Sequence, residues 1–315
     1  MKLSNQTLSK LIKGAYQFKT QDGYLTFRRF DEAQLEYLKF RDFFEVRSRS
    51  SASVTAEFMT DANEISFDFK VFDLCSCDTV DVYVNNFAVG RKYVKDIGNK
   101  GKLSFALPEG KKRVTLYFPT DAGFGVKNFK IEGSWRRINK KAPKVLWIGD
   151  SITQGYGSLI TGITYVNVAN RILGYDILNQ GIGGYYYDAG VLTPMEGYYP
   201  DKIILAMGTN QYLSADKEEK IVGFFEKFRK VYPTVPTLVI TPLWRGDAPS
   251  RLSELVATAD IIKREAMRSE NVTVVDGFDL LPHLPEYYMP DLLHPNPLGM
   301  QIMGETVAEI AKKIL

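Results

Sequence analysis

The sequence predicts two domains of different class, an all-β domain over residues 1–140 and an α/β domain over residues 141–315. The first domain is expected to be a β-sandwich of the jelly-roll type, and the second a doubly wound parallel sheet of five strands. Before residue 140 single apolar residues alternate with polar ones, whereas from residue 145 continuous apolar runs alternate with amphipathic stretches. A chain of 315 residues also exceeds one average hydrophobic core.

Short strands separated by turn residues build the predicted β domain. From Ile65 to Val71 every second residue is apolar, which is the period of a strand with one buried face. Turn residues such as Asn85-Asn86 and Pro108-Glu109-Gly110 close the strands. The strands predicted in this way cover residues 65–71, 80–84, 103–107, 114–118 and 129–131, and a short helix is expected over 31–40.

The predicted α/β domain begins with Val145-Leu146-Trp147-Ile148, a continuous apolar run typical of a parallel strand buried on both faces. Amphipathic stretches with apolar residues three and four apart alternate with four further short strands, so right-handed crossovers are expected. The later strands are predicted over 176–179, 203–207, 238–240 and 272–275, and the helices over 163–173, 221–228, 252–262 and 298–310.

Composition excludes some classes of function. The net charge of +3 is too small to indicate a nucleic-acid partner, and no apolar run approaches the ~18 residues of a membrane span. No signal peptide is visible after Met1, which predicts a cytoplasmic protein, or a secreted one if the sequence has been trimmed. Cys75 and Cys77 flank one residue and are expected to be reduced structural thiols on a strand. We expect no metal and no cofactor, and the sequence does not indicate the oligomeric state.

Three residue types of one hydrolytic mechanism occur at predicted strand ends and in a late loop. Ser151 follows the first strand of the α/β domain, and Asp291 precedes His294 by three residues. A serine nucleophile needs a base to take its proton, and the base needs a carboxylate to orient it. In doubly wound sheets the site lies beyond the carboxyl ends of the strands. Ser151, Asp291 and His294 are therefore the predicted catalytic residues.

Four segments carry a resemblance to a known family. Gly149-Asp150-Ser151-Ile152-Thr153 resembles the first motif of the GDSL/SGNH hydrolases, a family of serine esterases and lipase-like acylhydrolases with a flavodoxin-like fold. Three later segments resemble the remaining motifs, and they occur in the same order as in the family. They are Asn179-Gln180-Gly181-Ile182-Gly183-Gly184, Gly208-Thr209-Asn210 and Asp291-Leu292-Leu293-His294. The resemblance covers roughly residues 144–315 and implies a carboxylic ester hydrolase.

The resemblance also implies a role for each matching residue. Ser151 would be the nucleophile, His294 the general base and Asp291 its orienting carboxylate. The backbone N–H groups of Ser151 and Gly184 and the side-chain amide of Asn210 would form the oxyanion hole.

Two positions depart from the pattern of the family. Gln211 stands where many members carry Asp, and Gly183 where many carry Ser. Neither is a triad position, so they bear on loop geometry rather than on the chemistry.

Aromatic residues in the predicted loops suggest the kind of substrate. Tyr185 and Trp244 are expected to bind it, since aromatic faces with polar tips suit sugars or aryl groups. Arg245, beyond the fourth strand, could meet a substrate anion or face solvent, and the sequence favours solvent. The β domain resembles, by strand pattern alone, the jelly-roll modules that precede the SGNH domain in some carbohydrate esterases, and a scaffold that walls one side of the cleft is its expected role.

The sequence therefore predicts an esterase that removes a short acyl group, most simply acetyl, from a carbohydrate or similar small hydroxylated molecule. The alternatives are an acyltransferase or thioesterase with the same triad, and a glycan-binding protein with a vestigial hydrolase domain. Because all four motifs are intact, the vestigial alternative is the less favoured.

Overall fold

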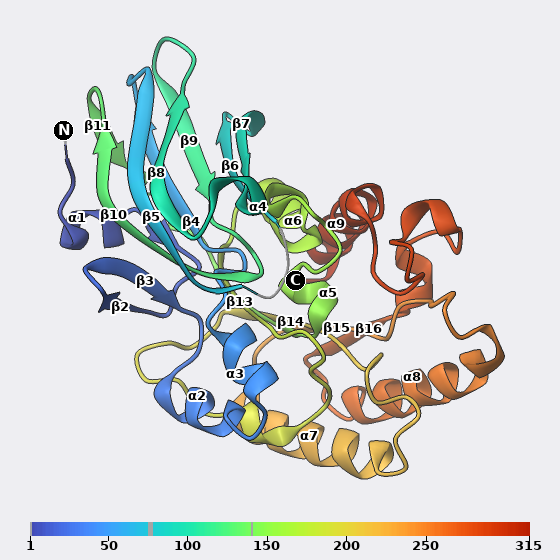
Figure 1. Ribbon diagram of the computed structural model, residues 1–315. Helices are drawn as coiled ribbons and strands as arrows, with labels where there is room; N and C mark the ends of the chain where they lie inside the picture. The colour runs from blue at the N-terminus through green and yellow to red at the C-terminus, as the bar shows by residue number, and fades with distance from the viewer. Residues whose placement is uncertain (1, 75–77, 140) are drawn as a thin grey trace.

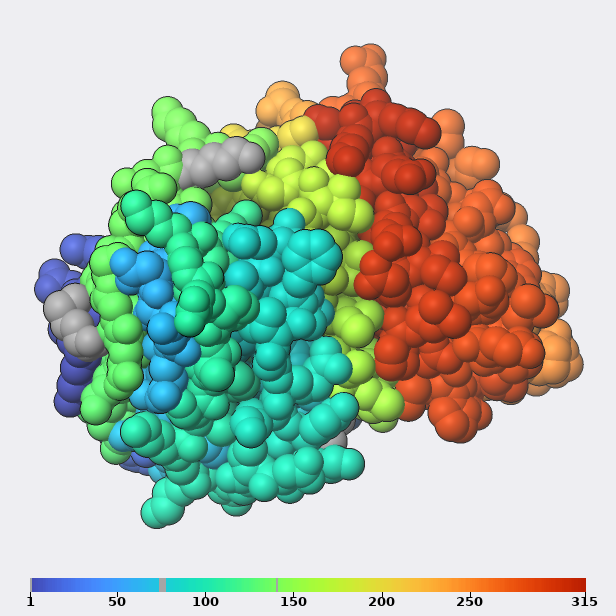
Figure 2. All heavy atoms as spheres, turned by 90° about the horizontal axis from the view of Figure 1, so that it is seen from above, coloured from blue at the N-terminus to red at the C-terminus, as the bar shows by residue number. Residues whose placement is uncertain are grey.

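A computed structural model describes residues 2–74, 78–139 and 141–315. It contains two antiparallel sheets in the N-terminal part and one parallel sheet in the C-terminal part (Figure 1). Seen from above, the two parts lie side by side in broad contact (Figure 2). The division at residue 140 remains a prediction, and Cys75 and Cys77 lie outside the described residues. In those residues no helix is both long and apolar enough to span a bilayer.

The N-terminal part is a β-sandwich, as predicted. Its sheets have the strand orders β1-β4-β9-β6-β7, with β11 paired to β4, and β2-β3-β10-β5-β8. Phe58 and Phe129 contact each other between the sheets, with ring centroids 6.2 Å apart. The strands are β1 Ile12–Lys13, β2 Gln17–Gln21, β3 Tyr24–Arg28, β4 Thr55–Thr60, β5 Glu64–Leu74, β6 Thr79–Val84, β7 Phe87–Tyr93, β8 Lys100–Ala106, β9 Lys112–Tyr117, β10 Ala122–Ile131 and β11 Trp135–Arg137.

The C-terminal part contains the predicted parallel sheet of five strands, in the order β13-β12-β14-β15-β16. Alternate residues of β12 face opposite layers of helices. Trp147 packs in the cluster that holds residues of α6 and α9, and Leu146 packs in the cluster that holds residues of α7 and α8. The elements are β12 Lys144–Gly149, α6 Tyr165–Leu173, β13 Asp176–Gly181, β14 Lys202–Ala206, α7 Lys217–Val231, β15 Thr237–Ile240, α8 Leu252–Ala266, β16 Val272–Val275 and α9 Pro297–Ile314.

Two helices of the N-terminal part do not belong to the sandwich core. Asp31 and Gln34 form a reciprocal capping box that starts the first of them, within the predicted range 31–40. Phe30, Leu38 and Phe44, from this region, are buried in the same cluster as Leu146 of the parallel sheet. Figure 1 shows both helices on the side of α7. The remaining α-helices are α1 Asn5–Ser9, α2 Glu32–Leu38, α3 Asp42–Ser48, α4 Val94–Ile97 and α5 Ser151–Gln154.

Candidate active site

The predicted nucleophile lies at the carboxyl end of a central strand. Ser151 is the first residue of the one-turn helix α5, two residues after the end of β12 at Gly149. Asp150 caps this helix by accepting a hydrogen bond from the N–H of Ile152. Only 7% of the surface of Ser151 is exposed, so its hydroxyl is held in place rather than free in solvent.

The three predicted catalytic residues meet in one hydrogen-bonded chain. Ser151 Oγ lies 2.8 Å from His294 Nε2, and His294 Nδ1 lies 2.7 Å from Asp291 Oδ2. The other oxygen of Asp291 accepts hydrogen bonds of 3.0 Å from the N–H groups of Leu293 and His294. Because Asp291 accepts the Nδ1 proton, Nε2 is left as the basic nitrogen that faces the serine.

The loop that carries the acid and the base has a constrained backbone. Leu292 has a φ of +52°, an uncommon value for a branched residue, and its carbonyl accepts a hydrogen bond of 2.8 Å from the N–H of Gly246. Burial raises the pKa of the Asp291 carboxyl, but the hydrogen bonds from His294 and Leu293 lower it by more, so its pKa is below the ordinary value. Asp291 is therefore held as a carboxylate beside the imidazole.

The three residues of the predicted oxyanion hole carry N–H groups that can bind a negatively charged oxygen. The backbone N–H groups of Ser151 and Gly184 have no hydrogen-bond acceptor within the described part of the chain. Gly184 has a φ of +76°, which favours glycine. Asn210 Nδ2 donates one hydrogen bond, of 2.8 Å, to the carbonyl of Tyr185, which fixes the amide and leaves its second N–H for a ligand. This set matches the oxyanion hole that the resemblance implies.

One side chain that the sequence did not single out joins α5, which carries Ser151, to residues 182–184, which we call the glycine loop. Gln154 is 1% exposed, and its Oε1 accepts a hydrogen bond of 2.6 Å from the N–H of Gly183. Its Nε2 donates to Asp121 in the β-sandwich. A glutamine three residues after the nucleophile has no distinctive sequence pattern, so this link could be found only from the structure.

A buried arginine of the N-terminal part holds the end of β13, just before the glycine loop. Arg29 is fully buried, and its Nη1 donates to the carbonyls of Asn179 and, at 3.1 Å, of Gly181. Its other N–H groups donate to the carbonyl of Arg47 and to the carbonyl and hydroxyl of Ser50, around the end of α3. The N-terminal part therefore positions β13, the strand that the glycine loop directly follows.

Asp150 is a titratable group beside the nucleophile. It is 3% exposed, and burial raises the pKa of its carboxyl to about 7, against the opposing hydrogen bond from Ile152 and the positive charge of Arg245. Because its Oδ1 already bonds the N–H of Ile152, its role is to shape the turn that presents Ser151.

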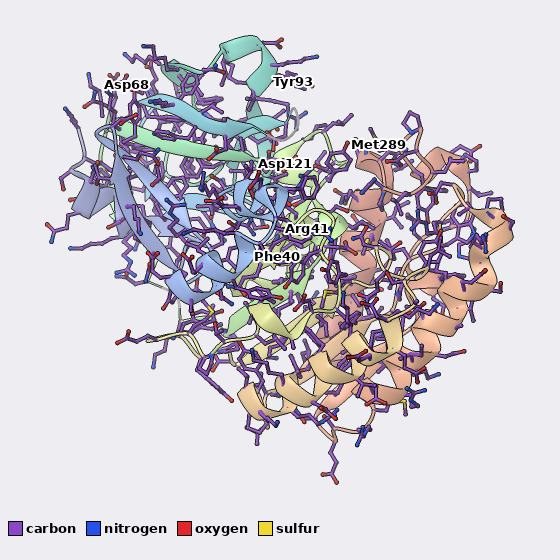
Figure 3. All side chains as sticks on the ribbon, turned by 60° about the horizontal axis from the view of Figure 1, so that its bottom comes forward. Phe40, Arg41, Asp68, Tyr93, Asp121 and Met289 are labelled. Carbon is purple, nitrogen blue, oxygen red and sulfur yellow. The ribbon has the colours of Figure 1, made fainter. Side chains whose placement is uncertain are left out.

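A cavity of about 110 Å³ is lined by Tyr156, the neighbour of His294. Asp78 and Thr120 of the β-sandwich line it together with Tyr156 and Met289 of the α/β part. The ring of Tyr156 contacts the imidazole of His294 edge to face, with centroids 4.6 Å apart. Figure 3 shows Asp121, the neighbour of Thr120, and Met289 on opposite sides of the boundary between the two parts. The sandwich thus contributes to the walls around the triad.

The structure corrects two expectations about the loops. Tyr185 is only 1% exposed and packs against Phe44, so its ring does not offer a face to substrate. Arg245 does not face solvent: its side chain is 12% exposed, and it pairs with Asp247 and donates to the carbonyl of Thr209. Both errors arose because residues of the N-terminal part and of neighbouring loops cover positions that look exposed in the sequence.

Trp244 is partly exposed and stacks on His283, with ring centroids 5.2 Å apart. His283 also contacts the carbonyl of Phe278 and takes no part in the triad. Trp244 therefore remains available as a predicted substrate-binding residue, whereas His283 is a loop residue that supports it.

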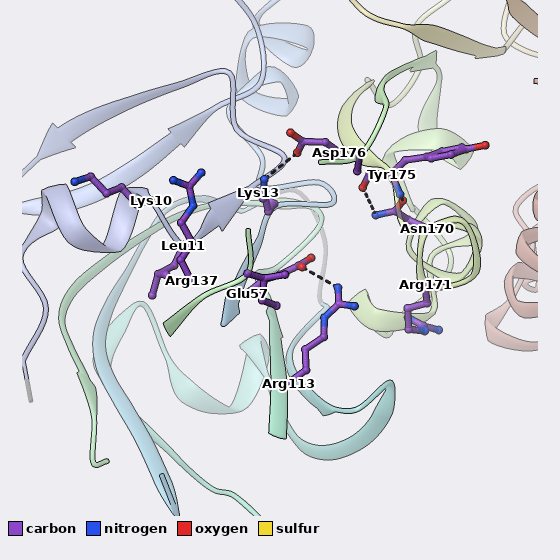
Figure 4. Close-up of a pocket in the computed structure, with 13 residues that line it drawn as sticks. Lys10, Leu11, Lys13, Glu57, Arg113, Arg137, Asn170, Arg171, Tyr175 and Asp176 are labelled. Atoms are coloured by element: carbon purple, nitrogen blue, oxygen red, sulfur yellow. Dashed lines mark hydrogen bonds and ion pairs between the residues drawn. The ribbon is translucent and has the colours of Figure 1, made fainter. Parts of the chain in front are cut away.

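Figure 4 shows a different pocket, of about 90 Å³, also between the two parts. Its side chains include the ion pairs Lys13–Asp176, at 3.5 Å, and Arg113–Glu57, at 2.9 Å. Asp176 is the first residue of β13, whereas the glycine loop follows the last residue of this strand, Gly181. This pocket therefore lies at the amino end of β13, whereas Ser151 follows the carboxyl end of β12, so the pocket is not part of the candidate active site.

Residues 147–302 match the model of the GDSL-like Lipase/Acylhydrolase family. The matched range contains Ser151, Gly184, Asn210, Asp291 and His294. No curated protein matches the chain.

Similar solved structures cover nearly the whole chain. A salicylyl-acyltransferase, SsfX3, from a tetracycline biosynthetic pathway has a TM-score of 0.72 and 22% identity, covering 96% of this chain and 95% of its own. A protein from Bacteroides ovatus described as GDSL-like lipase has a TM-score of 0.80 and 18% identity, covering 100% and 97%. An acetyl xylan esterase, Est2A, from the rumen bacterium Butyrivibrio proteoclasticus has a TM-score of 0.66 and 16% identity, covering 99% and 98%. At these identities the likeness shows a shared fold. The match over residues 147–302 identifies this part of the chain as a domain of the GDSL-like lipase/acylhydrolase family.

Proposed function

We propose that this protein is a serine esterase that removes a short acyl group, most simply acetyl, from a carbohydrate or a similar hydroxylated small molecule. The observation that carries the proposal is the continuous chain from Ser151 through His294 to Asp291, with contacts of 2.8 and 2.7 Å. The backbone N–H groups of Ser151 and Gly184 have no acceptor among the described residues, and Gly183, the neighbour of Gly184, is bonded to Gln154 of the helix that begins at Ser151. The family supports an acylhydrolase, and the fold shared with an acetyl xylan esterase supports the choice of substrate class.

In the proposed reaction, Ser151 Oγ attacks the ester carbonyl while His294 Nε2 takes its proton. The carbonyl oxygen becomes negative and accepts hydrogen bonds from Ser151, Gly184 and Asn210, each of which is worth about 10²–10³ in rate. His294 then gives its proton to the leaving alcohol, and the acyl group remains on Ser151. Water, deprotonated by the same histidine, releases the acid and restores the serine. These steps need no metal or cofactor.

Hydrolysis of p-nitrophenyl acetate by the wild type and by Ser151→Ala tests the proposal. Turnover should fall by at least a thousandfold in the variant and should decrease along the acetate, butyrate and octanoate series. Ser253→Ala is the matched control, because Ser253 is exposed and its hydroxyl donates a hydrogen bond to the neighbouring Glu254. A folded Ser151→Ala protein that keeps more than a tenth of the activity would falsify the mechanism. Acetylated sugars then test the alcohol portion.

Acyl transfer is the second candidate, because the fold is shared over almost the whole length with a salicylyl-acyltransferase. The same acyl-enzyme serves both reactions, and only the acceptor differs. Adding a sugar alcohol to the assay separates them: an ester product formed faster than free acetate indicates a transferase.

A further inference from the structure

The helix α3, which belongs to the N-terminal part, lies against the glycine loop. A Cβ atom placed on Gly184 would lie 2.8 Å from Phe43 Cε1, and one placed on Gly183 would lie 2.4 Å from Arg47 Nε. Arg47 thus crosses the backbone directly before the glycine that is proposed to bind the oxyanion. Figure 3 places Phe40 and Arg41, at the start of this segment, where the two parts of the molecule meet.

Arg47 depends on the absence of a side chain at residue 183. A Cβ atom at residue 183 would lie 2.4 Å from Nε and 2.7 Å from Cδ of Arg47, so any larger residue here would displace this side chain. The glycine is therefore explained by the arginine, a residue 136 positions earlier in the chain.

Arg47 is not neutralised by the protein. No carboxylate of the described residues lies within 4 Å of its guanidinium, and its Nε is buried without a hydrogen-bond partner. Among the described residues, the aromatic ring that its guanidinium contacts is that of Phe43, with Cζ 3.4 Å from the ring centroid. By contrast, Arg49 on the same segment pairs with Glu45 and Asp73.

A half-buried cation without an acceptor is unusual in a purely structural role, because an unmade hydrogen bond of a buried donor costs free energy. The stacking on Phe43 orients the guanidinium but satisfies none of its N–H groups. Phe43 itself is 48% exposed, so the pair lies at the surface beside the proposed reaction centre.

We propose that Arg47, stacked on Phe43, is a subsite for a carboxylate carried by the substrate. A guanidinium and a carboxylate match in geometry and charge, and such bonds are stronger than those between neutral groups. The inference rests on the proposed esterase function. Since a short acyl group has no room for a charge, the carboxylate belongs to the alcohol portion, as in an acetylated sugar acid or an acetylated hydroxybenzoate.

Matched esters test the subsite. The acetates of 3- and 4-hydroxybenzoate are compared with those of the corresponding hydroxybenzamides, which have the same shape without the charge. We expect the wild type to prefer the anionic ester in kcat/KM by about tenfold or more, and Arg47→Gln to lose that preference. Arg41→Gln is the control, since it removes a charge from the start of the same segment, where Arg41 lies over Phe40 and Phe44.

Each outcome decides between the subsite and a rival. An equal ratio in the wild type and Arg47→Gln overturns the proposal, and so does an equal loss in Arg41→Gln, which would indicate a diffuse field. A preference seen only with p-nitrophenyl hemisuccinate, in which the acyl group bears the charge, overturns the assignment to the alcohol.

A binding measurement separates failure of the subsite from failure of the esterase proposal. Calorimetry with 4-acetamidobenzoate and 4-acetamidobenzamide requires no turnover of an ester. Tighter binding of the carboxylate by the wild type, lost in Arg47→Gln, supports the subsite even if no ester is hydrolysed. Equal binding of the two compounds by the wild type overturns it.

Discussion

The side-chain oxygen of Gln154 accepts a hydrogen bond of 2.6 Å from the backbone N–H of Gly183. This bond joins α5, which carries Ser151, to the loop that carries Gly184, so it holds in place the two backbone donors that we propose for the oxyanion hole. Preorganisation of this kind is effective only when the donors do not move during the reaction. The catalytic geometry therefore depends on a residue that takes no part in the chemistry.

Replacing Gln154 with Leu should lower kcat on p-nitrophenyl acetate by about tenfold or more with a smaller change in KM, because the donors act mainly on the transition state. The buried N–H of Gly183 would lose its acceptor, at a cost of about 1–3 kcal/mol in the free energy of unfolding. Asn167→Leu is the control, since it removes a similar buried bond, 2.7 Å to the carbonyl of Thr161, away from the triad. An unchanged kcat in folded Gln154→Leu would contradict the positioning role.

Arg29→Lys tests whether the N-terminal part positions the end of β13 and the glycine loop that follows it. Lysine keeps the charge but cannot donate in the directions of Ser50, Arg47 and Gly181 at once. We expect kcat to fall about tenfold and the free energy of unfolding to fall by about 2–4 kcal/mol. Arg91→Lys, which weakens the bond to buried Asp81, should cost stability without loss of kcat. Equal losses of kcat in both variants would mean that general destabilisation is the cause.

Asp150→Asn should make stability less dependent on pH. The folded-state pKa of Asp150 is raised to about 7 from an ordinary value of 3.8, so its contribution to stability is full below pH 3.8 and is lost as the pH rises through 7. Asparagine keeps an oxygen for the N–H of Ile152 but does not ionise. Thermal unfolding should show the variant gaining on the wild type between pH 5 and pH 8, by at most about 3 kcal/mol. A difference that does not change with pH would argue against a raised pKa.

Asp291→Asn should reduce kcat by about 10²–10⁴-fold while KM changes little, because the amide no longer selects the Nδ1–H tautomer of His294. The pKa of Asp291 is lowered in the folded protein, so its stabilising effect is present above the ordinary pKa of 3.8 and disappears as the pH falls through the folded value. The stability of the wild type and the variant should therefore converge in acid. Steady-state kinetics at pH 8 and unfolding at pH 3 and pH 8 check both expectations. Near-normal kcat in Asp291→Asn would remove the carboxylate from the mechanism.

The sequence predicted the parallel sheet well because its strands are buried on both faces and read as continuous apolar runs, as in Val145 to Ile148. Ser151, Asp291 and His294, which were predicted to be catalytic from their places at a strand end and in a late loop, form one hydrogen-bonded chain, and their catalytic role stays a prediction. The helix predicted over 31–40 is present as Glu32–Leu38, since Asp31 and Gln34 provide its start.

The sequence did not reveal what crosses between the two parts. Nothing local marks Arg29, Phe43 or Arg47 as neighbours of a loop more than 130 residues away, because their environment exists only after both sheets have formed. Tyr185 was misassigned for the same reason, since Phe44 covers its ring. Strands β1 to β4 were also missed, being short or lacking a clear alternation of apolar residues.

The burial of Arg29 between α3 and the end of β13 limits how such a chain can be rebuilt by recombination. A different β-sandwich joined to residues 141–315 would leave the carbonyls of Asn179 and Gly181 without their donor, and would also remove the wall formed by Phe43. A functional chimera would have to carry residues 29–50, from Arg29 through α3 to Ser50, along with the C-terminal part. The unit that evolution or an engineer can exchange is therefore discontinuous in sequence, and it does not coincide with the division predicted at residue 140.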